Sequence, residues 1–244
     1  MGLNDQNYAL LKEHCLREGS TLFGVADVRQ IRQTFRLPSI KEELDCGISL
    51  GVRLSGAVLA EIEDGPTLLY AWHYRQANIV LDRVAFRLSE YIQEQGYRAL
   101  PIAASQIIDW RQQIAHLSHK HVGVLAGHGW IGRNNLLVHP QYGATVRYVT
   151  VLTDMPLPTA KPLEFGCNAC RRCLSVCPSQ ALGETPEDYN FDRCFEQLKA
   201  FRDKRKIGHY ICGLCVKVCK GKSVHGKSQT SSQGEIDHSS DGHC

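Results

Sequence analysis

Eight of the 11 cysteines fall between residues 167 and 219, in the order Cys-x2-Cys-x2-Cys-x3-Cys-Pro, a single cysteine, and Cys-x2-Cys-x3-Cys. The first run has the spacing of bacterial ferredoxins, in which three thiolates bind one cubane and the fourth, followed by proline, binds the other. Zinc also binds Cys-x2-Cys pairs, but it requires neither the third cysteine at this spacing nor the Cys-Pro ending. The spacing therefore predicts two [4Fe-4S] clusters.

The ferredoxin pattern also predicts how the ligands divide between the two clusters. One set is Cys167, Cys170, Cys173 and Cys219, and the other set is Cys177, Cys194, Cys212 and Cys215. Two clusters in one module form a path for electrons. We therefore expect a partner that supplies low-potential electrons, of the ferredoxin or flavodoxin type.

Basic residues gather around the same cysteines, with Asp203 as the single acid between residues 199 and 222. The cations are Arg171, Arg172, Lys199, Arg202, Lys204, Arg205, Lys206, Lys217, Lys220 and Lys222. An oxidised cubane with four thiolates carries a charge of about −2. Two interpretations stay open: these cations compensate the charge of the clusters, or they bind a phosphate backbone.

A glycine-rich turn precedes the cysteines, with the sequence Gly127-His128-Gly129-Trp130-Ile131-Gly132-Arg133-Asn134. It is not a dinucleotide-binding turn, because a predicted helix precedes it and a predicted strand follows, which reverses the required order. We expect the glycines to let the backbone approach a bulky cofactor. Trp130 and Ile131 would form its apolar wall and Arg133 a polar anchor. The alternative is a tight connection with a core tryptophan.

Four histidines lie just before or inside this turn, namely His116, His119, His121 and His128. Imidazole titrates near physiological pH, so any of them could donate a proton during a reduction. For each one taken singly, an ordinary structural role is the alternative.

Apolar periodicity predicts the elements that position these residues. Helices are expected over 8–17, 68–95 and 114–126, and strands over 21–25, 47–54 and 97–102, with 135–138 and 145–152 as an antiparallel pair. The sequence thus predicts an α+β domain over 1–160 and a cluster module over 161–222, joined by a proline-rich linker at 156–164. Residues 223–244 contain almost no apolar side chain, so we expect a disordered tail.

The overall composition is that of a globular protein, with 43% hydrophobic residues and a net charge of +3 over 244 residues. This charge is too small for a dedicated binder of nucleic acid or anionic membrane. No stretch approaches the roughly 18 apolar residues of a membrane-spanning helix, and the start has no export signal. We therefore expect a cytoplasmic protein without a membrane partner, whose cysteines do not form a disulfide framework.

The chain resembles epoxyqueuosine reductases, a family related to corrinoid-dependent reductive dehalogenases. The resemblance rests on the glycine-rich turn, on Tyr142-Gly143, on the run Leu152-Thr153-Asp154-Met155-Pro156-Leu157 and on the order of the eight cysteines. It covers roughly residues 45–220. It implies a cobalamin held on a nitroreductase-like α+β domain, with Gly127, Gly129, Gly132 and Asn134 of the turn among its contacts, and two [4Fe-4S] clusters that feed electrons to the cobalt.

The resemblance also implies an activity: the family removes the epoxide oxygen from a modified tRNA base, in the last step of queuosine biosynthesis, so tRNA is an expected partner. Its catalytic acid is an aspartate ahead of the glycine turn, where this chain has Gln113. Asp109, His116 and His119 are therefore the candidate acids. Two alternatives stay open: a ferredoxin-type electron-transfer protein, and a reductase that activates a corrinoid without a tRNA substrate.

Overall fold

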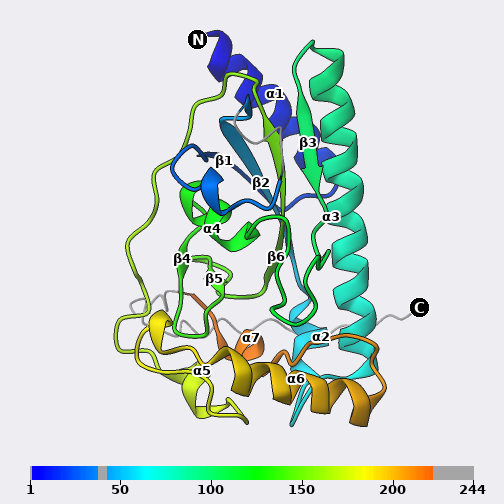
Figure 1. The fold of residues 1–244 in the computed structure, drawn as a ribbon, viewed down its shortest axis with the longest axis vertical. Helices are drawn as coiled ribbons and strands as arrows, with labels where there is room; N and C mark the ends of the chain where they lie inside the picture. The colour runs from blue at the N-terminus through cyan, green and yellow to red at the C-terminus, as the bar shows by residue number, and fades with distance from the viewer. Residues whose placement is uncertain (1, 38–42, 222–244) are drawn as a thin grey trace, which may run out of the picture.

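The computed structural model describes residues 2–37 and 43–221. Its centre is an antiparallel sheet with the strand order β1-β2-β6-β3. The strands span Leu22–Asp27 (β1), Cys46–Arg53 (β2), Val146–Thr153 (β6) and Ala99–Ile102 (β3) (Figure 1). The strands predicted over 21–25, 47–54 and 97–102 are confirmed to within two residues at each end.

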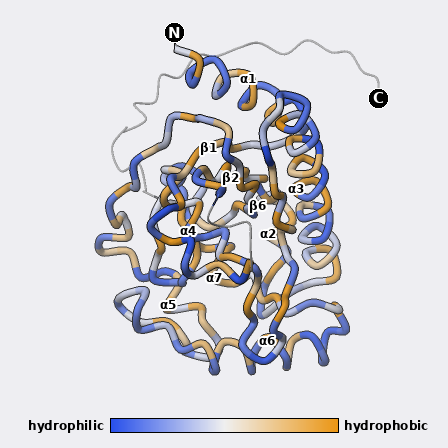
Figure 2. The backbone as a smooth tube through the Cα atoms, turned by 45° about the horizontal axis from the view of Figure 1, so that its top comes forward, coloured by the Kyte–Doolittle hydropathy of each residue, from blue (hydrophilic) through white to orange (hydrophobic). Residues whose placement is uncertain are grey.

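Helices α1 (Leu3–Arg17) and α3 (Leu68–Glu94) cover one face of the sheet. The core between them includes Leu11 of α1, Leu81 and Leu88 of α3, and Ile48 and Val149 of the strands, all fully buried. These α3 positions recur at helical spacing, and the Thr67 hydroxyl accepts a hydrogen bond from the Tyr70 N–H at 3.0 Å to cap the helix. The predicted helix over 68–95 is confirmed, and Figure 2 shows hydrophobic and hydrophilic positions alternating along it.

The other face of the sheet packs against the short helix α4 (His119–Leu125) and the segment that contains the 3-10 turn η1 (Arg32–Thr34). The helix predicted over 114–126 is confirmed from His119, whereas the prediction is wrong for residues 114–118. Ile114 pairs instead with Asp109 in an isolated bridge, and residues 115–118 have no regular structure. The Asp109 carboxylate accepts hydrogen bonds from the Arg111 and Gln112 N–H groups, and such a local turn just ahead of Ile114 competes with helix formation.

The predicted pairing of 135–138 with 145–152 is also wrong. Strand β5 (Leu137–Val138) pairs with β4 (Trp130–Ile131), in the register Trp130↔Val138. One edge of β6 is paired with β2 along its whole length, and the second half of the other edge is paired with β3. The hairpin of β4 and β5 forms a second, two-stranded sheet next to α4.

The cysteine-rich segment lies at one end of the sheet, below it in Figure 1. It contains α5 (Arg172–Ser175), the 3-10 turn η3 (Pro186–Asp188), α6 (Phe191–Arg205) and α7 (Leu214–Val218). Ile207, Ile211 and Leu214 pack in one core with Ile62, which follows helix α2 (Gly56–Ala60), and with Tyr70 of α3. The two parts of the chain therefore share a hydrophobic core.

Residues 156–164 have no regular secondary structure and run along the side of the sheet to the cysteine segment (Figure 1). The Ala160 N–H donates a hydrogen bond to the Val25 carbonyl at 2.8 Å, which ties this connection to the free edge of β1. Within the described ranges, no helix has the length and apolar character needed to cross a bilayer. The predicted tail, 223–244, lies outside the described residues.

Replacing Gly129 by alanine should destabilise the fold, because a Cβ there would overlap the Val138 carbonyl across the β4–β5 hairpin. We expect a loss of about 3 kcal/mol or more in the free energy of unfolding, measured by urea titration. The control is Gly56→Ala at the start of α2, where a Cβ meets no atom within 4 Å. An equal loss in both variants would contradict the steric explanation.

Candidate functional site

The eight clustered cysteines line two separate cavities. The first, of about 570 Å³, is lined by Cys167, Cys170, Cys173 and Cys219. The second, of about 260 Å³, is lined by Cys177, Cys194, Cys212 and Cys215. This grouping is the same as the ligand division predicted from the spacing, whereas the clusters themselves stay a prediction. Among the described residues, no three His, Cys, Asp or Glu side chains lie close enough to hold a single metal ion.

The thiols in both cavities are held in surroundings that disfavour a free thiolate. Burial, with the neighbouring cysteines adding to it, raises the pKa of Cys173 and of Cys212 to about 11. The same two causes raise the pKa of Cys215 well above its ordinary value. A thiolate buried in this way needs a positively charged partner, and iron ions supply that charge when they bind sulfur.

The glycine-rich turn lies against the first cavity. The Trp130 indole N–H donates a hydrogen bond to the Cys167 sulfur at 3.3 Å, and the Arg133 guanidinium donates one to the Cys170 carbonyl at 3.1 Å. Asn134 lines both cysteine cavities. A Cβ on Gly132 would come within 3.4 Å of the Cys167 sulfur. The turn therefore supports the first cysteine set directly.

The remaining turn residues contact other parts of the chain. A Cβ on Gly127 would meet Ala160, and one on Gly129 would meet Val138. Ile131 lines a groove beside Leu163 and Phe165. At these two glycines, the backbone therefore lies close to other parts of the protein. The predicted contact of the turn with a corrin ring stays a prediction.

A third cavity, of about 620 Å³, lies between α3, β6, β5 and the residues that lead into α4. It shares part of its wall with the second cysteine cavity, and the shared residues are Tyr70, Tyr74, Lys120, Leu136, Arg147 and Val216. The second cysteine set is therefore the one next to this cavity. Its lining, in the described part of the chain, includes none of residues 127–134.

Tyr74 and Arg147 form a pair in this shared wall. The Arg147 guanidinium lies 4.5 Å from the centre of the Tyr74 ring and donates a hydrogen bond to the Asn78 side-chain oxygen at 3.1 Å. Burial by itself would raise the pKa of Tyr74, but the charge of Arg147 and hydrogen bonds, including one with Ser105, lower it below its ordinary value. A phenol whose pKa is lowered is a better proton donor. An arginine inside an apolar strand is visible in the sequence and signals a partly buried cation, but its partner Tyr74 is not.

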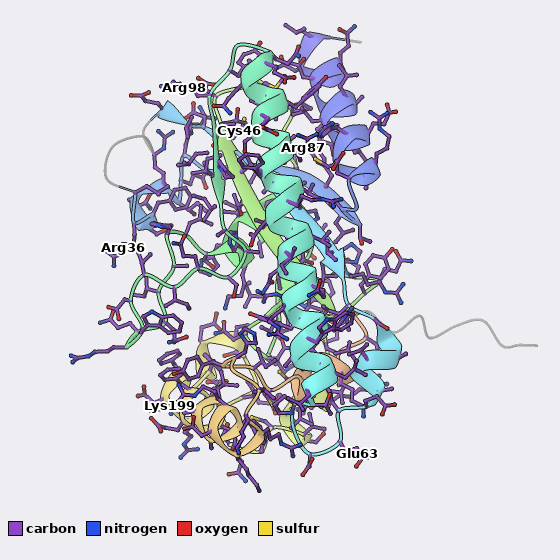
Figure 3. All side chains as sticks on the ribbon, turned by 90° about the vertical axis from the view of Figure 1, so that its right-hand side faces the viewer. Arg36, Cys46, Glu63, Arg87, Arg98 and Lys199 are labelled. Atoms are coloured by element: carbon purple, nitrogen blue, oxygen red, sulfur yellow. The ribbon has the colours of Figure 1, made fainter. Side chains whose placement is uncertain are left out.

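The three predicted acids lie in different environments. The Asp109 carboxylate is engaged with backbone N–H groups and, like His116, is not among the residues that line the third cavity. His116 Nδ1 lies 3.3 Å from the carbonyl of Arg36. Arg36 itself lines the third cavity and is labelled to the left of α3 in Figure 3. His119 is the one of the three that lines the cavity. Their role as acids stays a prediction.

The contacts of His119 fix its neutral form. Its Nε2 lies 3.0 Å from the Ala103 carbonyl, so Nε2 carries the proton, and its Nδ1 accepts from the Thr150 hydroxyl at 2.9 Å. Burial lowers the pKa of His119 to about 4. A neutral imidazole with both nitrogens engaged in this way is poorly suited to donate a proton.

No protein-family model matches the chain, but comparison with known proteins finds similar sequences among two kinds of reductase. It is 27% identical to the epoxyqueuosine reductase of Bacillus cereus over 213 residues, which are 82% of this chain and 54% of that protein. It is 32% identical to the tetrachloroethene reductive dehalogenase of Sulfurospirillum multivorans over 145 residues, which are 54% of this chain and 27% of that protein.

A solved structure of epoxyqueuosine reductase with an epoxyqueuosine-modified tRNA stem loop has the same fold. Its TM-score is 0.62 at 20% identity, over 91% of this chain and 67% of that chain. The resemblance seen in the sequence is therefore confirmed: epoxyqueuosine reductases and reductive dehalogenases are homologues of this chain, which has a mixed α and β fold. The chain spans about half, or less, of the length of these curated relatives.

The pKa of His119 predicts part of the pH dependence of stability. Because the folded state holds this histidine at a pKa of about 4, against 6.5 when unfolded, the unfolded state binds more protons on acidification. The stability from this group is complete above pH 6.5 and is lost as the pH falls toward 4. Between pH 7 and pH 5, urea unfolding of the wild type should lose about 2 kcal/mol more than that of His119→Gln. Equal losses would contradict the neutral state assigned to His119.

Proposed function

We propose that this chain is the cofactor-binding and electron-delivering part of a corrinoid-dependent reductase similar to epoxyqueuosine reductase. The proposal rests on one observation above all: eight cysteines divide between two cavities, and the second shares its wall with a larger cavity beside the sheet. In this proposal, residues 1–160 form a nitroreductase-like cobalamin domain and residues 161–222 a ferredoxin-like module. We place the protein in the cytoplasm, where thiols stay reduced.

The residues present fit the proposed cofactors. In the described part of the chain, each cysteine cavity is lined by four sulfurs and no carboxylate, which is the donor set of an iron–sulfur cluster. The 620 Å³ cavity combines apolar walls such as Leu117 and Leu137 with polar groups such as Ser118 and Lys120, as large cofactor sites do. When bound, the clusters supply a path for electrons and the cobalamin supplies a cobalt centre that reduces the substrate.

The residues of this chain hold the proton and exclude water. We assign the proton to the Tyr74 hydroxyl, which lies on the wall shared by the larger cavity and the second cysteine cavity. Arg147 stabilises the phenolate that remains after the proton leaves, because its guanidinium is next to the ring and has neutral hydrogen-bond partners. Leu54 and Val146 line the same space and keep it apolar.

The proposed substrate is epoxyqueuosine in tRNA. Support comes from the homologous reductase whose solved structure contains such a stem loop. Exposed cations on and after α6, such as Lys204 and Lys206, are available to a phosphate backbone. The alternatives are a ferredoxin-type electron-transfer protein and a corrinoid-activating reductase. Of these two alternatives, the exposure of Cys170 favours the electron-transfer protein, because it makes one cysteine set accessible to a redox partner.

Cysteine variants test the cofactor assignment. After anaerobic reconstitution, the wild type should hold about eight irons per chain and retain cobalamin through desalting, measured by iron assay and by the EPR signal of cob(II)alamin. Cys170→Ser and Cys212→Ser should each lower the iron content to about four. Cys46→Ser in β2 is the matched control and should keep about eight. Eight irons without retained cobalamin would favour the electron-transfer protein instead.

Replacing Tyr74 by phenylalanine tests the proton assignment. With an epoxyqueuosine-modified stem loop as substrate, turnover by Tyr74→Phe should fall about 100-fold or more, whereas iron content and cluster reduction stay unchanged. Wild-type turnover should also decline as the pH rises through the lowered pKa of Tyr74, and the variant should lack this decline. The control, Tyr97→Phe ahead of β3, should behave as the wild type. Unchanged turnover in Tyr74→Phe would show that another group gives the proton.

A further inference from the structure

The first cysteine cavity opens to solvent along a short edge of the molecule, formed by residues 168–172 and Lys220, which we name the Cys170 edge. All six residues are exposed and line the cavity. Cys170 is the exposed member of the eight clustered cysteines, whereas the other seven are partly buried. Asn168 and Ala169 have short side chains, so another molecule can approach the cavity closely there. The first cavity thus has a cysteine at the surface, whereas the cysteines of the second are partly buried and its wall is shared with the larger cavity.

The Cys170 edge is positively charged. Among the described residues, the first cavity is lined by four cations, Arg133, Arg171, Arg172 and Lys220, and by no carboxylate. Glu184 forms ion pairs with Arg171 at 2.7 Å and with Arg133 at 3.7 Å. An oxidised cubane with four thiolates carries a charge of about −2, so the four cations, Glu184 and the cluster together leave a charge of about +1 around this cavity. Arg172 and Lys220 are exposed and have no acidic partner among the described residues.

We propose that the Cys170 edge is the docking surface for a small electron-transfer protein with an acidic face, of the flavodoxin or ferredoxin type. Each encounter passes one electron: the donor is oxidised by one electron, the first cysteine centre is reduced by one, and no bond forms or breaks. A positive edge steers an acidic partner and raises its association rate. A phosphate backbone is the poorer fit, because tight binding to it needs a longer row of cations than the three of this edge, one of which is paired with Glu184.

This inference rests on the proposed clusters but not on the proposed cobalamin or tRNA. The test uses the full chain reconstituted with iron and sulfide, with a bacterial flavodoxin as the probe. Arg172→Glu/Lys220→Glu reverses both free charges of the edge. Lys12→Glu/Arg83→Glu is the matched control, because it reverses one exposed lysine on α1 and one exposed arginine on α3, the helix that carries Arg87 in Figure 3.

Two measurements are made at low ionic strength. Binding of oxidised flavodoxin is followed by quenching of its flavin fluorescence, and cluster reduction is followed by stopped-flow absorbance with reduced flavodoxin or with photoreduced deazaflavin, a small neutral reductant. We expect the edge variant to weaken flavodoxin binding and to slow reduction by flavodoxin tenfold or more. The rate of reduction by deazaflavin should differ less than twofold between the edge variant and the wild type. Added salt should slow reduction of the wild type by flavodoxin but not by deazaflavin.

The outcomes separate the alternatives. If the edge variant keeps wild-type binding and rates, or if the control variant loses them instead, the docking surface is not the Cys170 edge. If the edge variant binds flavodoxin normally but loses affinity for a tRNA stem loop, the surface belongs to RNA and the inference is wrong. The absence of iron after reconstitution would instead overturn the proposed function. Arg172→Gln/Lys220→Gln, which removes the charges without reversing them, should give an intermediate loss.

Discussion

The packing of α7 and the residues before it against α2 and α3 sets the position of everything else in the site. Ile211 and Leu214 share a core with Ile62 and Tyr70, and Gly213 sits so close to Ile62 and Tyr70 that any side chain there would overlap them. Lys217 also donates a hydrogen bond to the Ala60 carbonyl at 3.0 Å. Because α7 carries Cys215, this contact fixes the second cysteine cavity against the larger cavity. Without it, the two cavities would have no common wall.

The wall shared by the two cavities contains the cation Arg147, whose side chain has no role in the pairing of the sheet. Arg147 is the partly exposed position of β6, whose other seven residues are buried, and removing an arginine from water is costly unless its donors are satisfied. Asn78 and the Ala104 carbonyl accept its hydrogen bonds, and the Tyr74 ring covers its face. These partners are all neutral. The positive charge is therefore free to act on the phenol of Tyr74, which is why the pKa of Tyr74 falls although the group is largely enclosed.

Sequence reasoning succeeded where the determining interactions are local. The grouping of the cysteines in two cavities follows their spacing, and the periodic apolar positions of α3 predicted its length almost to the residue. It failed where distant partners decide. β5 pairs with β4 and not with β6, whose edges pair with β2 and, over the second half, with β3. Ile114, the first residue of a predicted helix, pairs instead with Asp109 in an isolated bridge. Tyr74 and Arg147 are 73 residues apart, so no local pattern could join them.

The two cysteine cavities differ in the exposure of their cysteines, and in the proposed function this difference sets the direction of electron flow through the module. In the proposed function both cavities hold iron. The first keeps Cys170 at the surface, whereas in the second burial raises the pKa of Cys215 well above its ordinary value. A centre that must meet a partner needs exposure, whereas a centre that serves a reaction needs a dry wall. The glycine-rich turn contacts both cysteine sets. Trp130 and Arg133 donate hydrogen bonds to the first set, and Asn134 lines the second cavity. The turn thus contacts both the cavity at the exposed Cys170 edge and the second cysteine cavity.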